Sequence, residues 1–556
     1  MNDIILKQCS SLEKIFLNDK EIREGYTGNS VLRGEEISYQ IAFKAKEERS
    51  FMANVSIDAP KGCSAELYLV ENVPCSFPIY PFCEDEDYIT KEPGLFPDLL
   101  LPVENKEFLV SPYQWRSIWV TLKTSASITS GNHTITVTFK SEKENVCESI
   151  CFDLSVIDAE KEPAERIFTQ WFYADCIADA HKVEIFCQRH WELIESYIKM
   201  AGENGINMLL TPVLTPPLDT EVGAERPTVQ LIDVFKEGEC YRFGYEKLER
   251  WIGIMQRHNV KYIEISHLFT QWGAKCAPKV IAEENGKMIK LFGWETEATS
   301  KEYSNFLSQF IPSLRKFLSE RGLLKNTYFH ISDEPNKDNL ESYLSAKEVA
   351  QKYLEGCNVI DALSSLDFYK KGVVKKPVVA TTSIEKFIGE NVPDLWAYYC
   401  CSQFERMANR FLAMPSYRNR ILGVQLYRYN IQGFLHWGYN FYYSQLSRFF
   451  CDPHRITDSY GGFPGGDAFI VYPGEDCALP SLRLKVFYEM IQDVAALEKL
   501  EKLVGRDEVI RLIDETAGEV ITFKSYPRNS EFLLKLRRKV NEQIENKSEI
   551  LLTKRR

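Results

Sequence analysis

The first part of the chain alternates hydrophobic and polar residues with the period of β-strands. Short segments with apolar side chains at every second position, separated by turn residues, lie at 36–43, 51–57, 115–122 and 133–139. Such alternation is typical of an antiparallel β-sandwich, in which each strand turns one face to the core. We therefore predict a β-sandwich domain over residues 1–162. Residues 87–98 are too rich in Pro and Gly for a regular strand, so we expect a long loop there.

From residue 163 onward, short apolar segments alternate with segments of helical periodicity. Strands are predicted at 167–173, 206–210, 260–266, 327–332, 358–363, 378–382 and 395–400, and helices at 189–203, 245–258, 302–321 and 341–354. The repetition continues through 420–427 and 433–438. About eight such repeats are typical of a (β/α)₈ TIM-like barrel, which we predict over residues 163–500. An open doubly wound sheet is the alternative, but no GxGxxG motif follows the first strand.

The last part of the chain, residues 501–556, is charged and has helical periodicity. Its apolar residues recur at helical spacing as Val509, Leu512 and Ile513, and then as Phe532, Leu533 and Leu536. We predict a helical C-terminal tail that packs against the barrel through these side chains. A contact between two copies of the chain is the alternative, and the oligomeric state stays open.

Composition and charge indicate which classes of binding partner, and which cellular compartment, we expect for this protein. The net charge is −12 and no basic cluster dominates, so we expect no nucleic acid and no membrane as partner. No apolar stretch is long enough to span a bilayer, and charged residues interrupt the first 17 positions, unlike a secretory signal. The 15 cysteines are scattered without CxxC pairs, which is typical of free thiols. These features predict a cytoplasmic protein.

The candidate chemistry lies where the strand at 327–332 ends. The chain continues there as Asp333-Glu334-Pro335, and active sites of TIM barrels lie at the C-terminal ends of the strands. Two carboxyl groups at that position suit general acid–base chemistry. The alternative is that Asp333 caps the following helix, with Glu334 near the positive end of the helix dipole.

Aromatic and polar residues occupy the other strand ends. They include Trp171, His267, Trp272, Tyr398, Tyr399, Trp437 and Asn440. Aromatic rings stack on sugar C–H surfaces while polar groups bind the hydroxyls, so the set predicts a carbohydrate pocket. The alternative for each ring is a place in the core. No HExxH motif and no close His pair is present, so we expect no metal and no cofactor. The chain also lacks a GxSxG motif, which disfavours acyl transfer.

Three segments resemble the catalytic domain of glycoside hydrolase family 123, also called domain of unknown function 4091. They are His330–Pro335, Gly433–Asn440 and Pro464–Gly474, and the resemblance extends over residues 30–500. It implies a retaining exo-β-N-acetylgalactosaminidase whose substrate carries β-linked GalNAc. In such an enzyme the 2-acetamido group of the substrate replaces a protein nucleophile.

The resemblance also implies roles for individual residues. Asp333 would accept the acetamido N–H and stabilise the developing oxazolinium, and Glu334 would protonate the leaving oxygen and then activate water.

Three further roles concern the binding of the sugar. By the same resemblance, Trp437 would form the pocket floor, Asp467 would bind hydroxyl groups, and either Tyr398 or Tyr399 would bind the acetamido carbonyl.

Two alternative functions stay open. The first is a glycosidase of the same fold acting on a sugar without the acetamido group, which needs a protein nucleophile; Glu264, Asp175 and Asp367 are the candidates. The second is a glycan-binding protein without catalysis. The aglycone, and the choice between GalNAc and GlcNAc, stay open as well.

Overall fold

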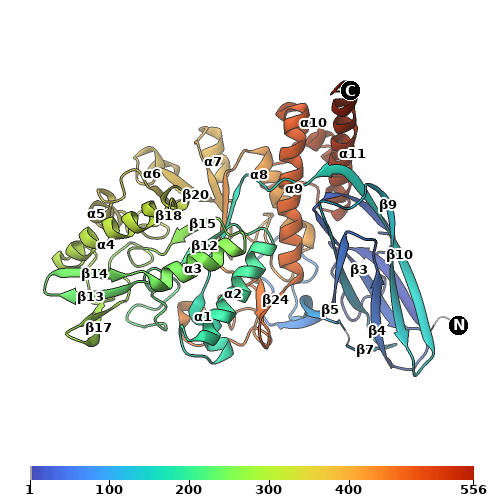
Figure 1. Ribbon diagram of the computed structural model, residues 1–556, viewed down its shortest axis with the longest axis horizontal. Coiled ribbons are helices and arrows are strands. Elements are labelled where there is room, and N and C mark those ends of the chain that lie inside the picture. The colour runs from blue at the N-terminus through green and yellow to red at the C-terminus, as the bar shows by residue number, and fades with distance from the viewer. Residues whose placement is uncertain (1–2, 105, 556) are drawn as a thin grey trace. The chain divides into compact units, whose positions relative to one another are not determined.

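The chain folds into two compact units, each built from separate segments. The computed structural model describes residues 3–104 and 106–555. The first unit takes the residues up to 165, residues 404–429 and those from 479 onward, and the second takes residues 166–403 and 430–478 (Figure 1).

The first unit contains a β-sandwich of two five-stranded sheets. One sheet has the order β1-β3-β8-β5-β6 and the other β2-β10-β9-β4-β7. Their bounds are Ile4–Ser10 (β1), Gly28–Arg33 (β2), Glu36–Ala45 (β3), Phe51–Asp58 (β4), Cys63–Cys75 (β5), Gly94–Pro102 (β6), Phe108–Val110 (β7), Arg116–Thr124 (β8), Gly131–Ser141 (β9) and Val146–Glu160 (β10). Tyr39 and Phe152 stack in the core with ring centroids 4.2 Å apart. The predicted sandwich is confirmed, although β2 pairs with β10 in parallel.

The loop expected over residues 87–98 is shorter than predicted. β6 begins at Gly94 and pairs with β5, and the register shifts between Glu71 and Asn72. β6 is the outermost strand of its sheet. An edge strand tolerates the missing N–H of a proline such as Pro97, which is why Pro-rich sequence forms a strand here.

The helices of the first unit include the predicted C-terminal tail. They are α8 (Ser416–Arg428), α9 (Leu482–Val504), α10 (Arg506–Ala517) and α11 (Ser530–Arg555). The apolar positions that were predicted to pack against the barrel, among them Leu512 and Leu533, are buried. Helix α11 packs against α9, α8 and the strands β2 and β10. The tail therefore packs within the unit of the sandwich, and the prediction that it packs against the barrel is wrong.

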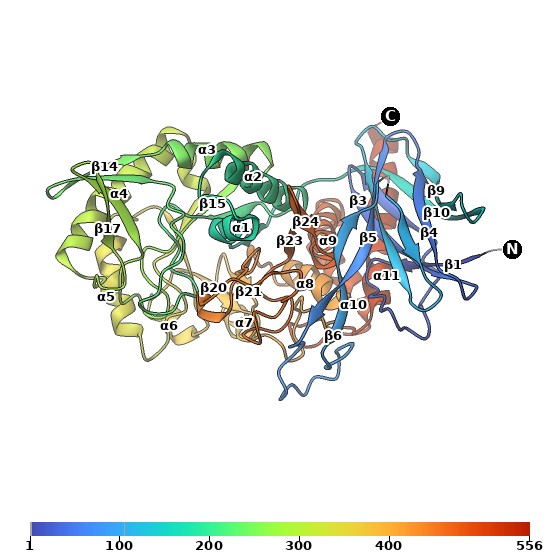
Figure 2. The same cartoon turned by 90° about the horizontal axis from the view of Figure 1, so that it is seen from below.

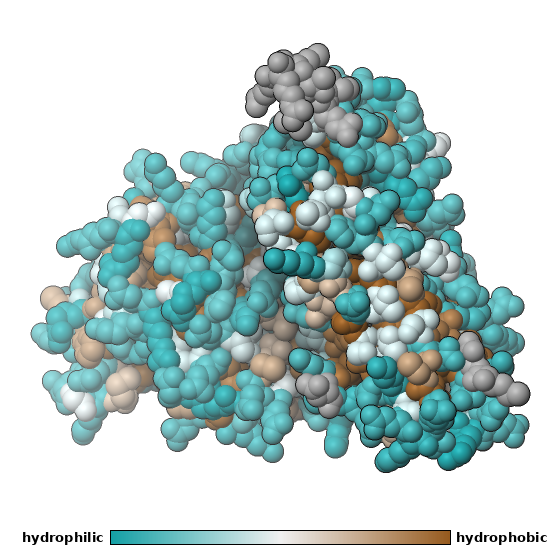
Figure 3. Space-filling view, turned by 45° about the vertical axis from the view of Figure 1, so that its right-hand side comes forward, coloured by the Kyte–Doolittle hydropathy of each residue, from teal (hydrophilic) through white to brown (hydrophobic). Residues whose placement is uncertain are grey.

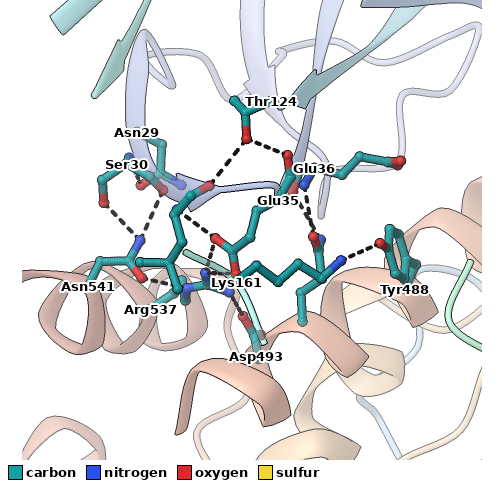
Figure 4. A network of polar contacts seen from close by, with 12 residues as sticks. Asn29, Ser30, Glu35, Glu36, Thr124, Lys161, Tyr488, Asp493, Arg537 and Asn541 are labelled. Carbon is teal, nitrogen blue, oxygen red and sulfur yellow. Dashed lines mark hydrogen bonds and ion pairs between the residues drawn. The ribbon is translucent and has the colours of Figure 1, made fainter. Parts of the chain in front are cut away.

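A buried polar network connects α11 to the sandwich (Figure 4). Arg537 donates to Glu35 Oε1 at 2.6 Å and to Asp493 Oδ1 at 3.2 Å. Asn541 donates to the carbonyl oxygen of Ser30 at 3.0 Å. The Arg537 side chain is only 9% exposed, so its charge depends on these partners rather than on water.

The second unit is the predicted barrel, which is confirmed. Eight strands close in the order β11-β12-β15-β18-β19-β20-β21-β22, and the neighbours pair in parallel. The bounds are Ile167–Gln170 (β11), Met208–Thr211 (β12), Tyr262–Ile265 (β15), Thr327–Phe329 (β18), Asn358–Ala362 (β19), Lys376–Ala380 (β20), Trp396–Tyr398 (β21) and Gly433–His436 (β22).

Helices and a small extra sheet accompany the barrel strands. The helices are α1 (Ala174–His181), α2 (Gln188–Glu203), α3 (Glu246–Arg257), α4 (Lys301–Glu320), α5 (Leu340–Gln351), α6 (Leu366–Lys370) and α7 (Ile384–Gly389). Figure 2 shows α3, α4 and α5 at the periphery of this unit. The extra sheet has the order β14-β13-β16-β17, formed by Cys240–Gly244, Asp233–Glu237, Val280–Glu284 and Lys287–Phe292.

Hydrophilic residues predominate on the face drawn in Figure 3, and hydrophobic residues form small areas there. Across residues 3–104 and 106–555, no helix combines the length and the apolar character needed to cross a membrane. Large apolar side chains that are exposed include Phe82, Tyr113 and Trp272.

Candidate active site

The predicted pair of carboxyl groups lies just beyond β18, at the C-terminal end of the barrel strands. Asp333 is buried, whereas the next residue, Glu334, is exposed. Glu334 has φ = 43°, in the left-handed region that residues with a Cβ rarely adopt. The backbone turns there, so the two side chains are not held on opposite faces as they would be in a strand.

The alternative in which Asp333 caps the next helix is wrong. Helix α5 begins at Leu340, and its N-cap position is Asn339. Asn339 Oδ1 accepts the main-chain N–H of Asn336 at 2.7 Å, so this segment forms a turn before the helix starts. The carboxyl group of Asp333 is therefore not used for capping.

Each carboxyl group of the pair has one hydrogen-bond donor among the described residues. Gln271, in the loop after β15, donates from Nε2 to Asp333 Oδ2 at 2.9 Å. Tyr398, at the end of β21, donates its hydroxyl to Glu334 Oε1. Burial, together with the neighbouring charge of Glu334, raises the pKa of Asp333 to about 7. Asp333 therefore changes between its neutral and ionised forms close to neutral pH.

A buried ionic network lies on the neighbouring barrel strands. Glu264 on β15 accepts from the hydroxyl of Thr169, from Trp171 Nε1 at 2.7 Å and from His330 Nε2 at 2.7 Å. The other ring nitrogen of His330 lies 3.2 Å from Asp361 Oδ1. Burial disfavours the charged ring, but the hydrogen bonds with Asp361 and Glu264 outweigh it and raise the pKa of His330 to about 9. His330 is thus a cation between two carboxylates.

His267 stacks on that cation and keeps its own nitrogens free. Its ring centroid lies 4.3 Å from that of His330 and 5.1 Å from that of Trp171. Only 1% of His267 is exposed, and among the described residues neither ring nitrogen has a hydrogen-bond partner. Burial and the nearby charge of His330 lower its pKa well below 6.5, so the ring is neutral. A buried polar group without a partner is suited to binding a ligand.

Trp437 and Asp467 form a second contact group, beyond β22. The indole of Trp437 is partly exposed and donates to Asp467 Oδ2 at 3.0 Å. The ring of Phe463 packs against this indole with centroids 4.9 Å apart. Asp467 itself is fully buried.

The remaining two predicted residues lie deeper in the structure. Tyr399 is fully buried, with its ring 5.2 Å from that of His436. Asn440 is also fully buried, and its amide both accepts from the main-chain N–H of Tyr173 and donates to its carbonyl, each at 2.9 Å. Its side chain therefore joins the segments that follow β22 and β11.

The three carboxyl groups considered as protein nucleophiles are engaged elsewhere or lie on a helix. Glu264 already accepts from three donors. Asp175 is buried and binds Arg226 through both oxygens, at 2.8 Å each. Asp367 is an exposed residue in the first turn of α6, a favourable place for a negative charge.

Sequence reasoning missed Gln271 and the pairing of Asp361 with His330. Gln271 lies in a loop with no recognisable pattern. Asp361 follows two apolar residues of β19, and a charge inside a buried strand was a signal that could have identified it.

Comparisons with known proteins agree with this architecture. The family model described as "Glycoside hydrolase 123, catalytic domain" matches residues 171–500. A family 123 glycoside hydrolase from Clostridium perfringens, whose structure was analysed for glycolipid glycan hydrolysis, is similar over 99% of both chains, with a TM-score of 0.72 and 14% identity.

Two other solved structures are more distant. The endo-β-1,4-mannanase of Thermotoga petrophila has a TM-score of 0.33 and 13% identity over 60% of this chain and 77% of its own. A β-glucuronidase of Parabacteroides merdae has a TM-score of 0.30 and 8% identity over 83% of this chain and 50% of its own. A comparison with curated proteins found no match. Because the family model covers more than half of the sequence and includes the Asp333-Glu334 segment, the chain belongs to glycoside hydrolase family 123.

Proposed function

We propose that this glycoside hydrolase is a retaining exo-β-N-acetylgalactosaminidase that uses the 2-acetamido group of its substrate as the nucleophile. The observation that carries the proposal is the pair after β18, in which a buried Asp333 directly precedes an exposed Glu334. Retaining glycosidases with a protein nucleophile hold a second carboxyl group about 5–5.5 Å from the acid, across the glycosidic bond. Substrate assistance needs no such group, but it does need one carboxylate to orient the acetamido group.

The contacts of two of the three candidate nucleophiles, Glu264 and Asp175, support this choice. Three donors hold Glu264, and Arg226 holds both oxygens of Asp175. A carboxylate held in this way is a poor nucleophile, because its lone pairs are already used. This favours the acetamido mechanism over a glycosidase that acts on a sugar without that group.

Burial distinguishes the roles that we propose for the two carboxyl groups, because Asp333 is buried and Glu334 is exposed. In the active form Asp333 is ionised and accepts the acetamido N–H, which directs the acetamido oxygen at the anomeric carbon and stabilises the oxazolinium. Glu334 holds the proton and gives it to the leaving oxygen, and then removes a proton from the water that opens the oxazolinium. The acetamido oxygen attacks from the face opposite the leaving group, and water then attacks from the face that the leaving group left, so the two inversions together retain the β configuration. Tyr398 keeps Glu334 in place through its hydroxyl.

The sugar would contact several of the remaining predicted residues. The partly exposed indole of Trp437 suits a floor under the ring, and His267 offers ring nitrogens to hydroxyl groups. Asp467 is fully buried and would act on the sugar through the indole of Trp437, which donates to its carboxyl group. Of the two tyrosines, Tyr398 is better placed for the acetamido carbonyl, because it contacts Glu334 while Tyr399 is fully buried; its single O–H would then turn from Glu334 to that carbonyl. We also place the enzyme in the cytoplasm, since its 15 cysteines, all among the described residues, are free thiols.

The test is hydrolysis of aryl β-glycosides of GalNAc, GlcNAc, galactose and glucose. We expect cleavage of the GalNAc glycoside and none of the 2-hydroxyl sugars. Glu334→Gln should lower kcat about 10²–10⁴-fold on a poor leaving group and much less on an activated aryl group, which departs without an acid. Asp333→Asn should lower kcat on both.

Two outcomes contradict the proposal. Equal cleavage of galactoside and GalNAc glycoside would require a protein nucleophile. No cleavage across the panel by a folded wild type would favour the glycan-binding alternative.

A further inference from the structure

We infer that Gln271 is a positioning residue of this hydrolase, which orients the carboxylate of Asp333 and stabilises its charge for the acetamido group. The inference rests on the proposed function, because only substrate assistance requires an ionised Asp333. Gln271 comes from the loop after β15, and its Nε2 lies 2.9 Å from Asp333 Oδ2. Among the described residues it is the only hydrogen-bond donor to Asp333.

The chemistry of its neighbours fixes which end of the amide faces Asp333. The oxygen and nitrogen of a glutamine are assigned from the hydrogen-bond network. The main-chain N–H of Asp219 lies 2.6 Å from Gln271 Oε1 and is only able to donate, so the amide oxygen must face it. The NH₂ group therefore faces the carboxyl group of Asp333, where a donor is needed.

Asp219, which donates to Gln271, also forms hydrogen bonds with the loop after β22. Asp219 Oδ2 accepts the main-chain N–H of Leu446 at 3.0 Å, and the Asp219 carbonyl accepts the hydroxyl of Ser447. Leu446 and Ser447 have φ of 61° and 52°, in the left-handed region, so the hydrogen bonds with Asp219 stabilise an unfavourable backbone conformation. Gln271 thus joins Asp333 to the loops that follow β12 and β22, and its amide is not free to rotate.

Several charges act on Asp333, and Gln271 opposes the largest effects. Burial and the charge of Glu334 raise the pKa of Asp333, and Asp361 also raises it, whereas the hydrogen bond from Gln271 and the cation His330 lower it. Removing the donor should raise the pKa of Asp333 further and favour its neutral form. A neutral Asp333 offers no negative charge to the acetamido N–H or to the developing oxazolinium.

Two substitutions test the role. Gln271→Met keeps the length and removes the donor, and Gln271→Glu keeps an acceptor for Asp219 while setting a carboxylate against Asp333. The matched control is Gln309→Met: Gln309 on α4 is also half-buried, accepts the main-chain N–H of Tyr241 at 3.0 Å and donates to the Glu239 carbonyl at 3.0 Å.

The first measurement is the pH profile of kcat/KM on an aryl β-GalNAc glycoside. Loss of one hydrogen bond to the charged form should move the acid limb upward by about one pH unit in Gln271→Met, and further in Gln271→Glu. Below that limb kcat/KM should fall about tenfold, with KM little changed because Gln271 does not bind the sugar. The control should keep the wild-type profile.

The second measurement needs no substrate. The carboxyl resonance of Asp333 in ¹³C-aspartate-labelled protein, identified by its loss in Asp333→Asn, gives the titration directly. An upward shift in both Gln271 variants, in step with the acid limb, supports the inference. An unchanged titration, or a shifted titration with an unchanged pH profile, overturns it.

The two measurements separate the two proposals. If the wild type cleaves none of the glycosides, the proposed function fails, while the resonance still decides whether Gln271 controls the charge of Asp333. If Gln271→Met does not fold, as judged by circular dichroism, Gln271→Glu carries the test, because it retains the contact with Asp219.

Discussion

Replacing Glu264 by glutamine should destabilise the barrel in a way that depends on pH. Glu264 is fully buried and is one of two carboxylates that hold His330 as a cation. The substituted amide would keep the shape of the side chain but remove its charge. His330 would then lose one of the partners that favour its imidazolium form.

The structure gives the size of the effect. The pKa of His330 is about 9 in the folded protein, against 6.5 for an unperturbed histidine. At about 1.4 kcal/mol per pH unit, this difference corresponds to about 3 kcal/mol of stability. Because the folded pKa is the higher one, this stability is fully present below pH 6.5 and is lost as the pH rises to about 9. The cost of Glu264→Gln should therefore be largest below pH 6.5 and smallest above about pH 9.

Urea unfolding at a series of pH values measures this difference. The control is Glu195→Gln, which breaks the partly exposed contact between Glu195 Oε1 and His258 Nε2 at 3.1 Å. A pair that water reaches contributes about 0–1 kcal/mol, so the control should change little at any pH. A loss for Glu264→Gln that is the same at pH 6 and pH 9.5 would refute the assignment of His330 as a buried cation.

Two further substitutions test the packing within each unit. Arg537→Met removes the cation that Figure 4 shows between α11 and the sandwich, and it should lower the free energy of unfolding by about 3–5 kcal/mol. The control is Arg538→Met at an exposed position, which should change that free energy little in the same urea titration. Gly433→Ala in β22 would set a methyl group against the ring of Trp396, and it should lower the free energy of unfolding by about 3 kcal/mol or prevent folding. The control is Gly389→Ala, whose methyl group meets no atom within 4 Å and should leave the stability unchanged. Thermal unfolding of both variants measures the difference.

The fold could be predicted because its signals are local. Alternation marked strands such as 133–139, and apolar strands between amphipathic helices marked the barrel. Boundaries were less accurate: the segment predicted as a strand over 327–332 pairs as β18 only to Phe329. His330 and Ile331 are buried, but their carbonyls accept from Leu268 and Phe269, in the loop after β15. An apolar segment predicts that its side chains are buried, but it does not predict which of its backbone groups form the hydrogen bonds of the sheet.

The site could be predicted only where its residues are neighbours in sequence. Asp333 and Glu334 are adjacent, and they were found together. Gln271 lies 2.9 Å from Asp333 in space but in another loop, and no pattern in the sequence connects the two. The sequence could not distinguish the roles of the adjacent Tyr398 and Tyr399, because only the fold brings the hydroxyl of Tyr398 to Glu334.

The role of a carboxyl group in this barrel follows from the number of donors that reach it. An ionised carboxylate offers about four lone-pair sites. Glu264 receives three side-chain donors, and Asp361 receives His330, Tyr343 and the main-chain N–H of Ile331, so these two groups stabilise the barrel.

Asp333 and Glu334 differ from those two groups in this respect. Among the described residues each has a single donor, Gln271 or Tyr398, which leaves sites for a substrate. A sequence shows all four as acidic residues at strand ends or within strands. Contacts between residues far apart in the sequence determine how many hydrogen-bond donors reach each carboxyl group, and therefore which carboxyl groups remain able to react.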